Sequence, residues 1–394
     1  MDEDEEHTIV MIMMTINALL AALLLVSSVE PIRPKSIVEQ RLDWDSFVEK
    51  YAERKDFSRH LRMPIASFNK LLDFLAPNLD VDINMASLRG PPISPQIKLY
   101  ATLRFLAGGS YSDIRFLTGI STSSFYRIVW KTIHAINSCK ELQISFPQSQ
   151  EDVLEAAKGF QSISTNGCIW NVASVIDGYH LQTHTPQKSQ VKNVRSFFSG
   201  HYQTYGVNVQ AACDHQCRFQ FIGVAGPGVM GDREALNQVE LGILIQNLPG
   251  LYCAIGDCAY SATEHLVPIF GGAQALVRRH DNFNFFVSQL RIRIEMAFGL
   301  MVKKWAILQR PLTIQMGNIK HLIVAIARLH NFCINERLEG HKKTQSSSHA
   351  MLILHPTREH SGSLPLILNL DIWKALFRIL GLGTVTGWCP SWKY

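Results

Sequence analysis

Three short acidic contexts contain the residue types best suited to chemistry in this chain. They are Ile176-Asp177-Gly178, Ile255-Gly256-Asp257, and the run from Arg291 to Gly299 that contains Glu295. Carboxylate oxygens are the ligands that hard divalent cations prefer. Two such cations can hold the attacking and leaving oxygens of a phosphodiester. The sequence therefore predicts, first of all, a metal-dependent enzyme that acts on nucleic acid.

The elements that must position these acids follow from the apolar pattern. Each aspartate is expected to close a short buried strand, at 172–176 and at 251–255. Two more strands are expected at 206–212 and 219–225, and a helix at 232–244. An antiparallel meander followed by a crossover helix and a further strand predicts a mixed α/β sheet with helices on its faces, the element order of a ribonuclease-H-like domain.

The region ahead of these strands, from residue 36 to about 140, is expected to be helical. Ser94 is a good helix cap with Pro95 at the first helical position. A short helix at 112–117, a turn at Gly119 and a longer helix capped by Ser121 or Thr122 are typical of a helix-turn-helix. An ordinary helical bundle is the alternative. Arg127 and Lys131 are expected to be exposed on the longer helix and to contact phosphates.

Composition and charge agree with a folded protein that binds nucleic acid. The chain has 394 residues, enough for two or three domains, and a net charge of +5. Seven of its lysines and arginines lie in 277–310, where only two acids occur. Among them, Arg291, Lys303 and Lys304 are candidate DNA contacts, with Trp305 as a candidate contact to a base. The alternatives are an ion pair of Arg291 with Glu295, one helical turn later, and a solvated basic face at Lys303 and Lys304. The eight cysteines include no C-x-x-C pair, so a zinc site is not expected.

The N-terminal end leaves several interpretations open. Five acids precede an apolar segment at 9–29 that is long enough to span a bilayer. A signal peptide would have bases at that place. The segment is interpreted as a helix that packs on the body or on a second subunit, as a membrane anchor, or as a wrongly assigned gene start. We expect domains at 1–33 (acidic start and leader helix), 34–150 (helical), 151–340 (nuclease) and 341–394, where a serine-rich linker at 341–349 precedes a tail without a pattern.

Six motifs in order resemble those of PIF/Harbinger-type transposases and the DDE superfamily nucleases derived from them, across roughly 60–336. No single motif is specific for this family, but the order and spacing of all six together are specific. They are Ile176-Asp177-Gly178-Tyr179-His180; Gly200-His201-Tyr202 followed by Val207-Asn208-Val209-Gln210; Pro227-Gly228 followed by Asp232; Gly256-Asp257-Cys258-Ala259-Tyr260; the run from Arg291 to Gly299; and Leu329-His330-Asn331.

The resemblance implies a DDE mechanism, in which Asp177, Asp257 and Glu295 bind Mg²⁺ or Mn²⁺. It also attributes Asp232 to the metal site, although Asp232 is equally suited to cap the following helix. The resemblance implies that the substrate is DNA and that the protein is located in the nucleus, with the cytoplasm. It also implies a Myb-like DNA-binding protein as a partner. Self-association and, as a minor alternative, membrane association are also left open.

The sequence departs from the family pattern before Asp232, where Gly231 stands in place of a frequent histidine, and in two further places. Tyr179 replaces a small threonine, and Phe197-Phe198-Ser199 stands where the family has basic residues. A second hypothesis is therefore a catalytically decayed transposase that binds DNA or protein. His180 is expected to support the site residues or the fold rather than to act as a base. His330 and Asn331 are expected to hold the last helix in place.

Overall fold

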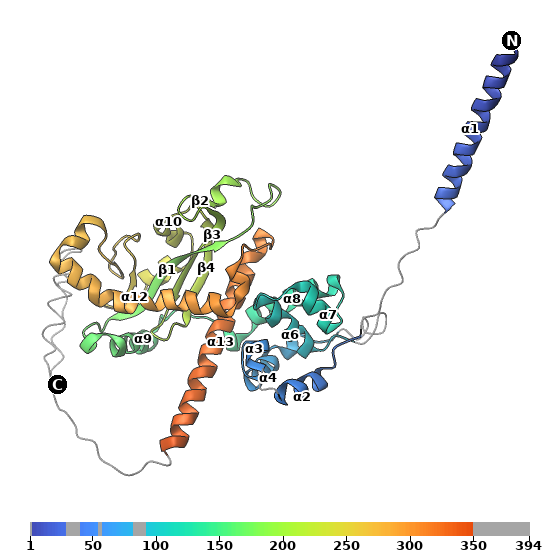
Figure 1. Ribbon diagram of the computed structural model, residues 1–394. Coiled ribbons are helices and arrows are strands. Elements are labelled where there is room, and N and C mark those ends of the chain that lie inside the picture. Colours follow the sequence, from blue (N-terminus) through green and yellow to red (C-terminus); the bar gives the residue numbers. More distant parts are fainter. Residues whose placement is uncertain (1, 29–39, 54–56, 82–91, 350–394) are drawn as a thin grey trace, which may run out of the picture. The chain divides into compact units, whose positions relative to one another are not determined.

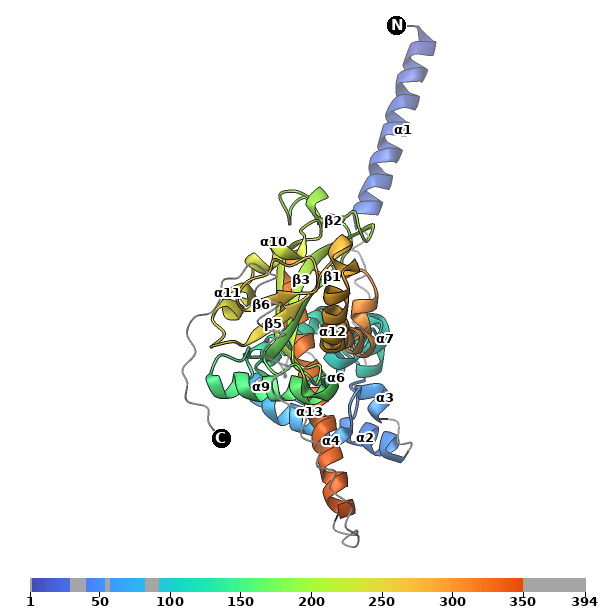
Figure 2. The ribbon, with the colours of Figure 1, turned by 90° about the vertical axis from the view of Figure 1, so that its left-hand side faces the viewer.

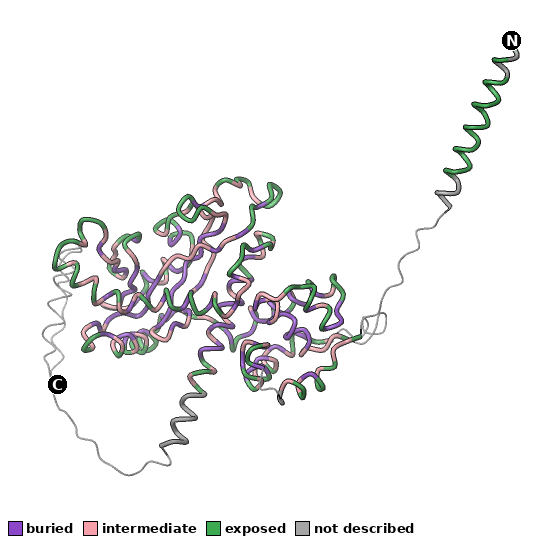
Figure 3. Tube along the Cα trace, viewed as in Figure 1, coloured by how far each residue is buried: buried purple, intermediate pink, exposed green. Residues whose placement is uncertain are grey.

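The structure is a computed structural model that describes residues 2–28, 40–53, 57–81 and 92–349. It divides into two units, Met1–Gln40 and Arg41–Tyr394, which are described separately. The first unit contains the helix α1 (Glu3–Ser28), and its side chains from Ile9 to Leu23 are exposed (Figures 1 and 3). In the described part of the chain, no helix combines the length and apolar character needed to cross a membrane.

The second unit begins with helices, as the sequence predicts. Ser94 Oγ accepts a hydrogen bond from Ile97 N, and Pro95 is the first helical residue. Gly119, at φ 63°, ends one helix, and Ser121 caps the next by accepting from Ser124 N. The helices are α2 (Trp44–Glu53), α3 (Phe57–Leu61), α4 (Ile65–Leu75), α6 (Pro95–Leu106), α7 (Tyr111–Thr118) and α8 (Thr122–Ser138).

A mixed six-stranded sheet follows (Figure 1). Three strands form an antiparallel meander in which β3 lies between β1 and β4, and β2 extends the edge beside β3. Beyond β1, two further strands run parallel to it in the order β5, β6. The strands are β1 (Val172–Gln182), β2 (Phe198–Ser199), β3 (Thr204–Cys213), β4 (Phe219–Pro227), β5 (Cys253–Gly256) and β6 (Leu266–Pro268).

Helices cover both faces of this sheet (Figure 2). On one face, Val175 and Val209 pack in a core with residues of α12 (Arg278–Lys304) and α13 (Met316–His349). On the other face, Ile176 and Ala212 pack with residues of α9, α10 and α11. These three helices are α9 (Gln150–Ile163), α10 (Asp232–Asn237) and α11 (Leu241–Gln246). Successive residues of β1 therefore face different helix layers.

The helical region and the sheet share one hydrophobic core. Phe68 and Leu71 of α4 belong to the same buried cluster as Val175 of β1 and Ile326 of α13. Helix α13 contacts both α8 and β4. The boundary expected near residue 150 is the start of α9, but the apolar packing continues across it.

Three expectations about elements are wrong. Asp177 lies within β1 and does not close it, because the strand continues to Gln182 as the hairpin partner of β3. The helix expected at 232–244 is two short helices, α10 and α11. The linker expected at 341–349 is the end of α13, since no proline interrupts the helix there. The tail at 350–394, and residues 29–33 of the leader, lie outside the described residues.

Candidate active site

Asp177 lies on the face of β1 that is covered by α12. Its neighbour Tyr179 stacks on Phe298 of α12, with ring centroids 5.1 Å apart. The Asp177 carboxylate accepts a hydrogen bond from Gly178 N at 2.8 Å, and lies 3.7 Å from Arg291 Nη1. Burial, followed by the charge of Asp257, raises the pKa of Asp177 to about 7. This carboxyl group therefore holds a proton unusually well in the absence of a cation.

Asp257 directly follows β5, the strand that runs parallel to β1. Its Oδ1 accepts a hydrogen bond from Ala259 N at 2.9 Å, which fixes the turn after the strand. Burial raises the pKa of Asp257, and the charge of Asp232 raises it further. Asp257 thus lies near enough to Asp177 for its charge to raise the pKa of Asp177.

Glu295 reaches the same region from α12 through Arg291, one helical turn earlier. Arg291 Nη2 lies 2.5 Å from Glu295 Oε1, and its Nη1 faces Asp177. The Glu295 side chain is 48% exposed, whereas those of Arg291 and Asp177 are about one-fifth exposed. One guanidinium group therefore joins two of the three acids that the sequence predicted as a triad.

Asp232 is held on the other face of β1, across Gly178. Its Oδ1 accepts hydrogen bonds from Asn208 Nδ2 and Gln210 Nε2, both at 3.0 Å. A Cβ atom added to Gly178 would lie 2.0 Å from the same Oδ1, so only glycine fits at that position. Gly231 is the N-cap residue of α10, and Asp232 is the first residue of the helix itself. The helix-cap alternative is therefore wrong.

A buried amide network, which the sequence reasoning missed, connects Asp232 to the loop of Asp257. Tyr260 donates a hydrogen bond from its hydroxyl to Gln210 Oε1 at 2.7 Å, and Gln210 Nε2 donates to Asn208 Oδ1 at 2.8 Å. Gln210 is fully buried in β3. The available signal was a pair of amide residues at i and i+2 on an otherwise apolar strand, since buried amides need specific partners.

The donor chemistry of these acids fits a hard divalent cation, because all four offer carboxylate oxygens. Their arrangement is not a preformed metal site: within the described residues, no three acidic, histidine or cysteine side chains are close enough to hold an ion together. The Arg291 guanidinium supplies the positive charge between Asp177 and Glu295. Arg291 thus pairs with two of the acids that the resemblance assigns to the metal.

The basic residues predicted to contact DNA differ in their surroundings. Arg127 and Lys131 are exposed on α8, and Lys131 Nζ donates to Asp80 O at 3.1 Å. Lys303 is exposed, but Lys304 is half-buried, and its charge lowers the pKa of the buried His330 after the larger effect of burial. Trp305 is fully buried, so the prediction that it contacts a base is wrong.

His180 and the segment that departs from the family pattern both contact the start of β3. His180 Nε2 lies 3.1 Å from Thr204 Oγ1, and its ring stacks on Tyr202. Phe198 and Ser199 form β2, which pairs with Tyr205 and Thr204 of β3. The hydrogen bond and stacking support a structural assignment for His180.

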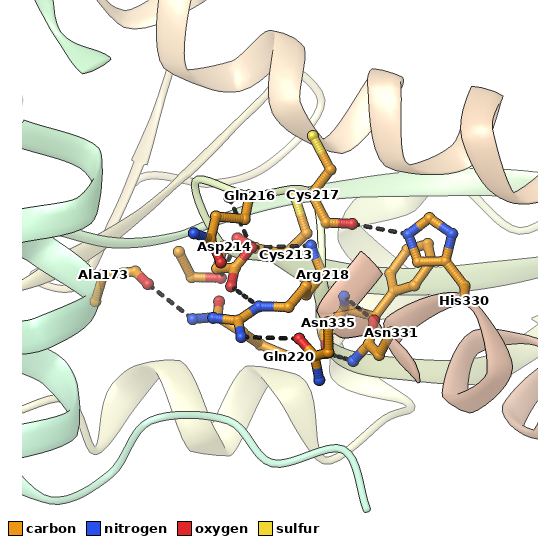
Figure 4. Close-up of polar contacts among 12 residues, drawn as sticks. Ala173, Cys213, Asp214, Gln216, Cys217, Arg218, Gln220, His330, Asn331 and Asn335 are labelled. Atoms are coloured by element: carbon orange, nitrogen blue, oxygen red, sulfur yellow. Dashed lines mark hydrogen bonds and ion pairs between the residues drawn. The ribbon is translucent and has the colours of Figure 1, made fainter. Parts of the chain in front are cut away.

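His330 and Asn331 hold α13 to the start of β4 (Figure 4). His330 Nε2 lies 2.8 Å from Cys217 O, and the Asn331 amide exchanges two 2.7 Å hydrogen bonds with the backbone of Phe219. These contacts agree with the expectation that His330 and Asn331 hold the last helix in place.

A pocket of about 330 Å³ lies beside these two residues and is lined in part by Asp214 and Arg218. None of the four acids of the candidate site lines this pocket.

Part of the chain is similar to known proteins. Residues 176–331 match the family model described as DDE superfamily endonuclease. HARBI1 of Xenopus laevis, which is named as a candidate nuclease, is 24% identical over 176 residues, or 44% of this chain and 48% of that protein. The chain thus spans about half the length of this relative. No solved structure matches. Residues 176–331 therefore match a DDE superfamily endonuclease domain, and the resemblance of the chain to the Harbinger-type nucleases is confirmed.

Proposed function

We propose that this protein is a divalent-metal-dependent DNA endonuclease in which Asp177, Asp257 and Glu295 hold the metal. The observation that carries the proposal is the convergence of two strands and one helix. Asp177 and Asp257 come from neighbouring parallel strands, and Arg291 connects Asp177 to Glu295. A DDE endonuclease domain that begins at residue 176 supports this assignment.

The fold of this domain is proposed to be ribonuclease-H-like. Three antiparallel strands followed by two parallel strands, with helices on both faces, support the assignment. The helix pair α7 and α8, joined at Gly119, is likewise proposed to form a helix-turn-helix-like unit. Arg127 and Lys131 on α8 would contact phosphates there. Nuclear location and a Myb-like partner remain predictions from the family resemblance.

Mg²⁺ or Mn²⁺, when bound, would activate the attacking oxygen and stabilise the leaving one. Binding of the metal would change the protonation and the ion pairs of the site residues. Burial and the charge of a neighbouring aspartate raise the pKa of Asp177 and of Asp257, so a bound cation would have to favour the ionised form of each. Arg291 would leave Asp177 and Glu295, because a cation takes over their charge. Its guanidinium would then be available to a phosphate of the bound DNA.

The metal role that the resemblance implies for Asp232 remains a prediction, and we propose a positioning role for this residue as well. Its carboxylate accepts hydrogen bonds from two amides on the face of β1 away from α12. The same amides connect through Gln210 to Tyr260, three residues after Asp257. Asp232 would therefore fix the distance between the strands that contain the two catalytic aspartates.

A specific observation also favours the second candidate, a decayed enzyme that binds DNA or protein. Arg291 forms ion pairs with Asp177 and Glu295, so two of the three acids have a positively charged partner that is part of the chain itself. Such a site would remain folded in a protein that no longer cleaves. The two candidates differ in whether a cation displaces Arg291.

The test is nicking of a supercoiled plasmid by the full chain, with Mg²⁺ or Mn²⁺. We expect metal-dependent nicking that Asp177→Asn and Glu295→Gln abolish. Glu264→Gln, at an exposed glutamate outside the site, is the control and should nick like the wild type. If the wild type is folded but nicks with neither cation, the endonuclease hypothesis is rejected. The hypothesis of a decayed enzyme that binds DNA or protein then remains.

A further inference from the structure

Tyr202 lies on the short loop 200–203 that connects β2 to β3. Ser199 and Thr204 pair directly before and after this loop. Within it, Tyr202 N donates a hydrogen bond to Ser199 Oγ at 3.4 Å, and Gln203 Nε2 donates to Gly200 O. The backbone of the loop is therefore well held, yet Tyr202 is 53% exposed. A large aromatic side chain is thus presented to solvent from a constrained position.

The ring of Tyr202 rests on His180, which has little room to move. The two ring centroids are 4.7 Å apart, and the ring planes differ by 14°. A Cβ atom at Gly206 would lie 2.6 Å from His180 Nε2, and one at Gly228 would lie 2.9 Å from His180 Cε1. The exposed His201 meets Tyr202 nearly at a right angle, with centroids 4.6 Å apart. His180 therefore fixes the plane of the Tyr202 ring.

Tyr202 borders the candidate active site. His180 is two residues after Gly178 on β1, so both lie on the face of the strand where Asp232 is held. Burial raises the pKa of Tyr202, and the charges of three acids of the site raise it further. These acids are Asp232, Asp177 and Asp257. The Tyr202 hydroxyl therefore lies within electrostatic reach of the carboxylates at which a phosphodiester would bind.

We propose that Tyr202 stacks on an unpaired base of the DNA strand whose phosphate lies at the acids. This inference rests on the proposed function, because it takes the candidate active site as the place where DNA binds. Aromatic side chains bind bases of any sequence by stacking, since every base has a π face. Bases inside a duplex stack on one another, so Tyr202 can stack only on a base that is unpaired or at a strand end.

The exposure of Tyr202 separates it from the tyrosines that pack inside the domain. Tyr260 is 3% exposed and donates its hydroxyl to Gln210. No hydrogen bond from the Tyr202 hydroxyl occurs within the part of the chain that the structure describes. Two substitutions distinguish a contact through the ring from one through the hydroxyl. Tyr202→Phe keeps the ring and removes the hydroxyl, whereas Tyr202→Leu removes the ring.

Fluorescence anisotropy of the full chain with Ca²⁺ tests the inference. It compares the affinity for a labelled oligothymidylate with the affinity for a labelled abasic strand of the same length and charge. We expect the wild type to bind the oligothymidylate about tenfold more tightly, and Tyr202→Leu to lose most of this preference. Tyr202→Phe should keep it. Phe285→Leu is the matched control and should also keep it, since Phe285 is 64% exposed near the start of α12.

Three results would each overturn the inference. They are equal affinity of the wild type for the two strands, an undiminished preference in Tyr202→Leu, and a loss in Tyr202→Phe as large as that in Tyr202→Leu. Thermal unfolding should show that the variants are folded, as expected for exposed positions. Plasmid nicking by the same proteins separates the two proposals. If the wild type nicks and Tyr202→Leu keeps the base preference, only the stacking inference fails. If the wild type does not nick and the preference still depends on Tyr202, only the endonuclease hypothesis fails.

Discussion

The Tyr260 hydroxyl donates a 2.7 Å hydrogen bond to Gln210 Oε1, and so joins the loop after β5 to the middle of β3. Both residues are buried, with Tyr260 3% exposed and Gln210 fully enclosed. Gln210 in turn donates to Asp232 and Asn208. The three family motifs that contain Asp232, Asp257 and the amides of β3 are therefore parts of one hydrogen-bonded unit.

Tyr260→Phe should destabilise the protein by ~1–3 kcal/mol, because Gln210 Oε1 is left buried without a donor. Denaturant unfolding at neutral pH measures the loss. Tyr111→Phe is the control, since Tyr111 is 42% exposed, and its loss should be small. Equal stability of Tyr260→Phe and the wild type would show that the network contributes nothing.

Gly178→Ala should be severely destabilising. The new Cβ would lie 2.0 Å from Asp232 Oδ1, so Asp232 must leave the two amides that donate to it. We expect a loss of ~3 kcal/mol from overpacking and broken hydrogen bonds. The control is Gly231→Ala, where a Cβ meets nothing within 4 Å. A cost for Gly178→Ala no larger than that for Gly231→Ala would contradict the close approach.

Arg291→Gln should bind Mn²⁺ more tightly than the wild type, because the cation no longer displaces a guanidinium group from Asp177 and Glu295. We expect about a tenfold gain, or ~1.4 kcal/mol. Titration calorimetry measures the affinity, with the exposed Arg279→Gln as the control for overall charge. If both variants gain equally, the ion pairs of Arg291 do not compete with the metal.

His330 should make the stability of the protein depend on pH. Burial lowers the pKa of His330 from 6.5 to about 4, so the unfolded chain binds more protons between these values. The contribution of neutral His330 to the free energy of unfolding is therefore complete above pH 6.5. The free energy of unfolding should fall by up to ~3 kcal/mol as the pH drops toward 4. Denaturant unfolding from pH 4 to pH 7.5 measures this slope.

The control for that slope is His330→Asn, compared at the same pH values. The variant should be less stable than the wild type at pH 7.5, because it loses packing on Phe219 and the contact with Cys217 O. Its stability should, however, depend less on pH between 4 and 6.5. Equal slopes in the two proteins would assign the pH dependence to other groups.

The sequence by itself determined much of this protein. Local signals fixed the start of α6 at Ser94 and Pro95 and the turn at Gly119, because caps and glycine turns depend on neighbouring residues alone. The order of long apolar runs indicated the mixed sheet, and the motifs indicated Asp177, Asp257 and Glu295. The short strands β2 and β6 were not predicted, because two or three residues are too few to show the alternation of apolar and polar residues that is typical of a strand.

Only the tertiary structure decided which acids share a face of the sheet. Alternation along β1 places Asp177 toward α12 and Gly178 toward Asp232, and the strand pairing then brings Gln210 beside Gly178. That pairing depends on contacts between residues far apart in the chain, which no local pattern encodes. The same holds for the burial of Trp305 and for Arg291 between two acids, since both depend on how α12 packs against its neighbours.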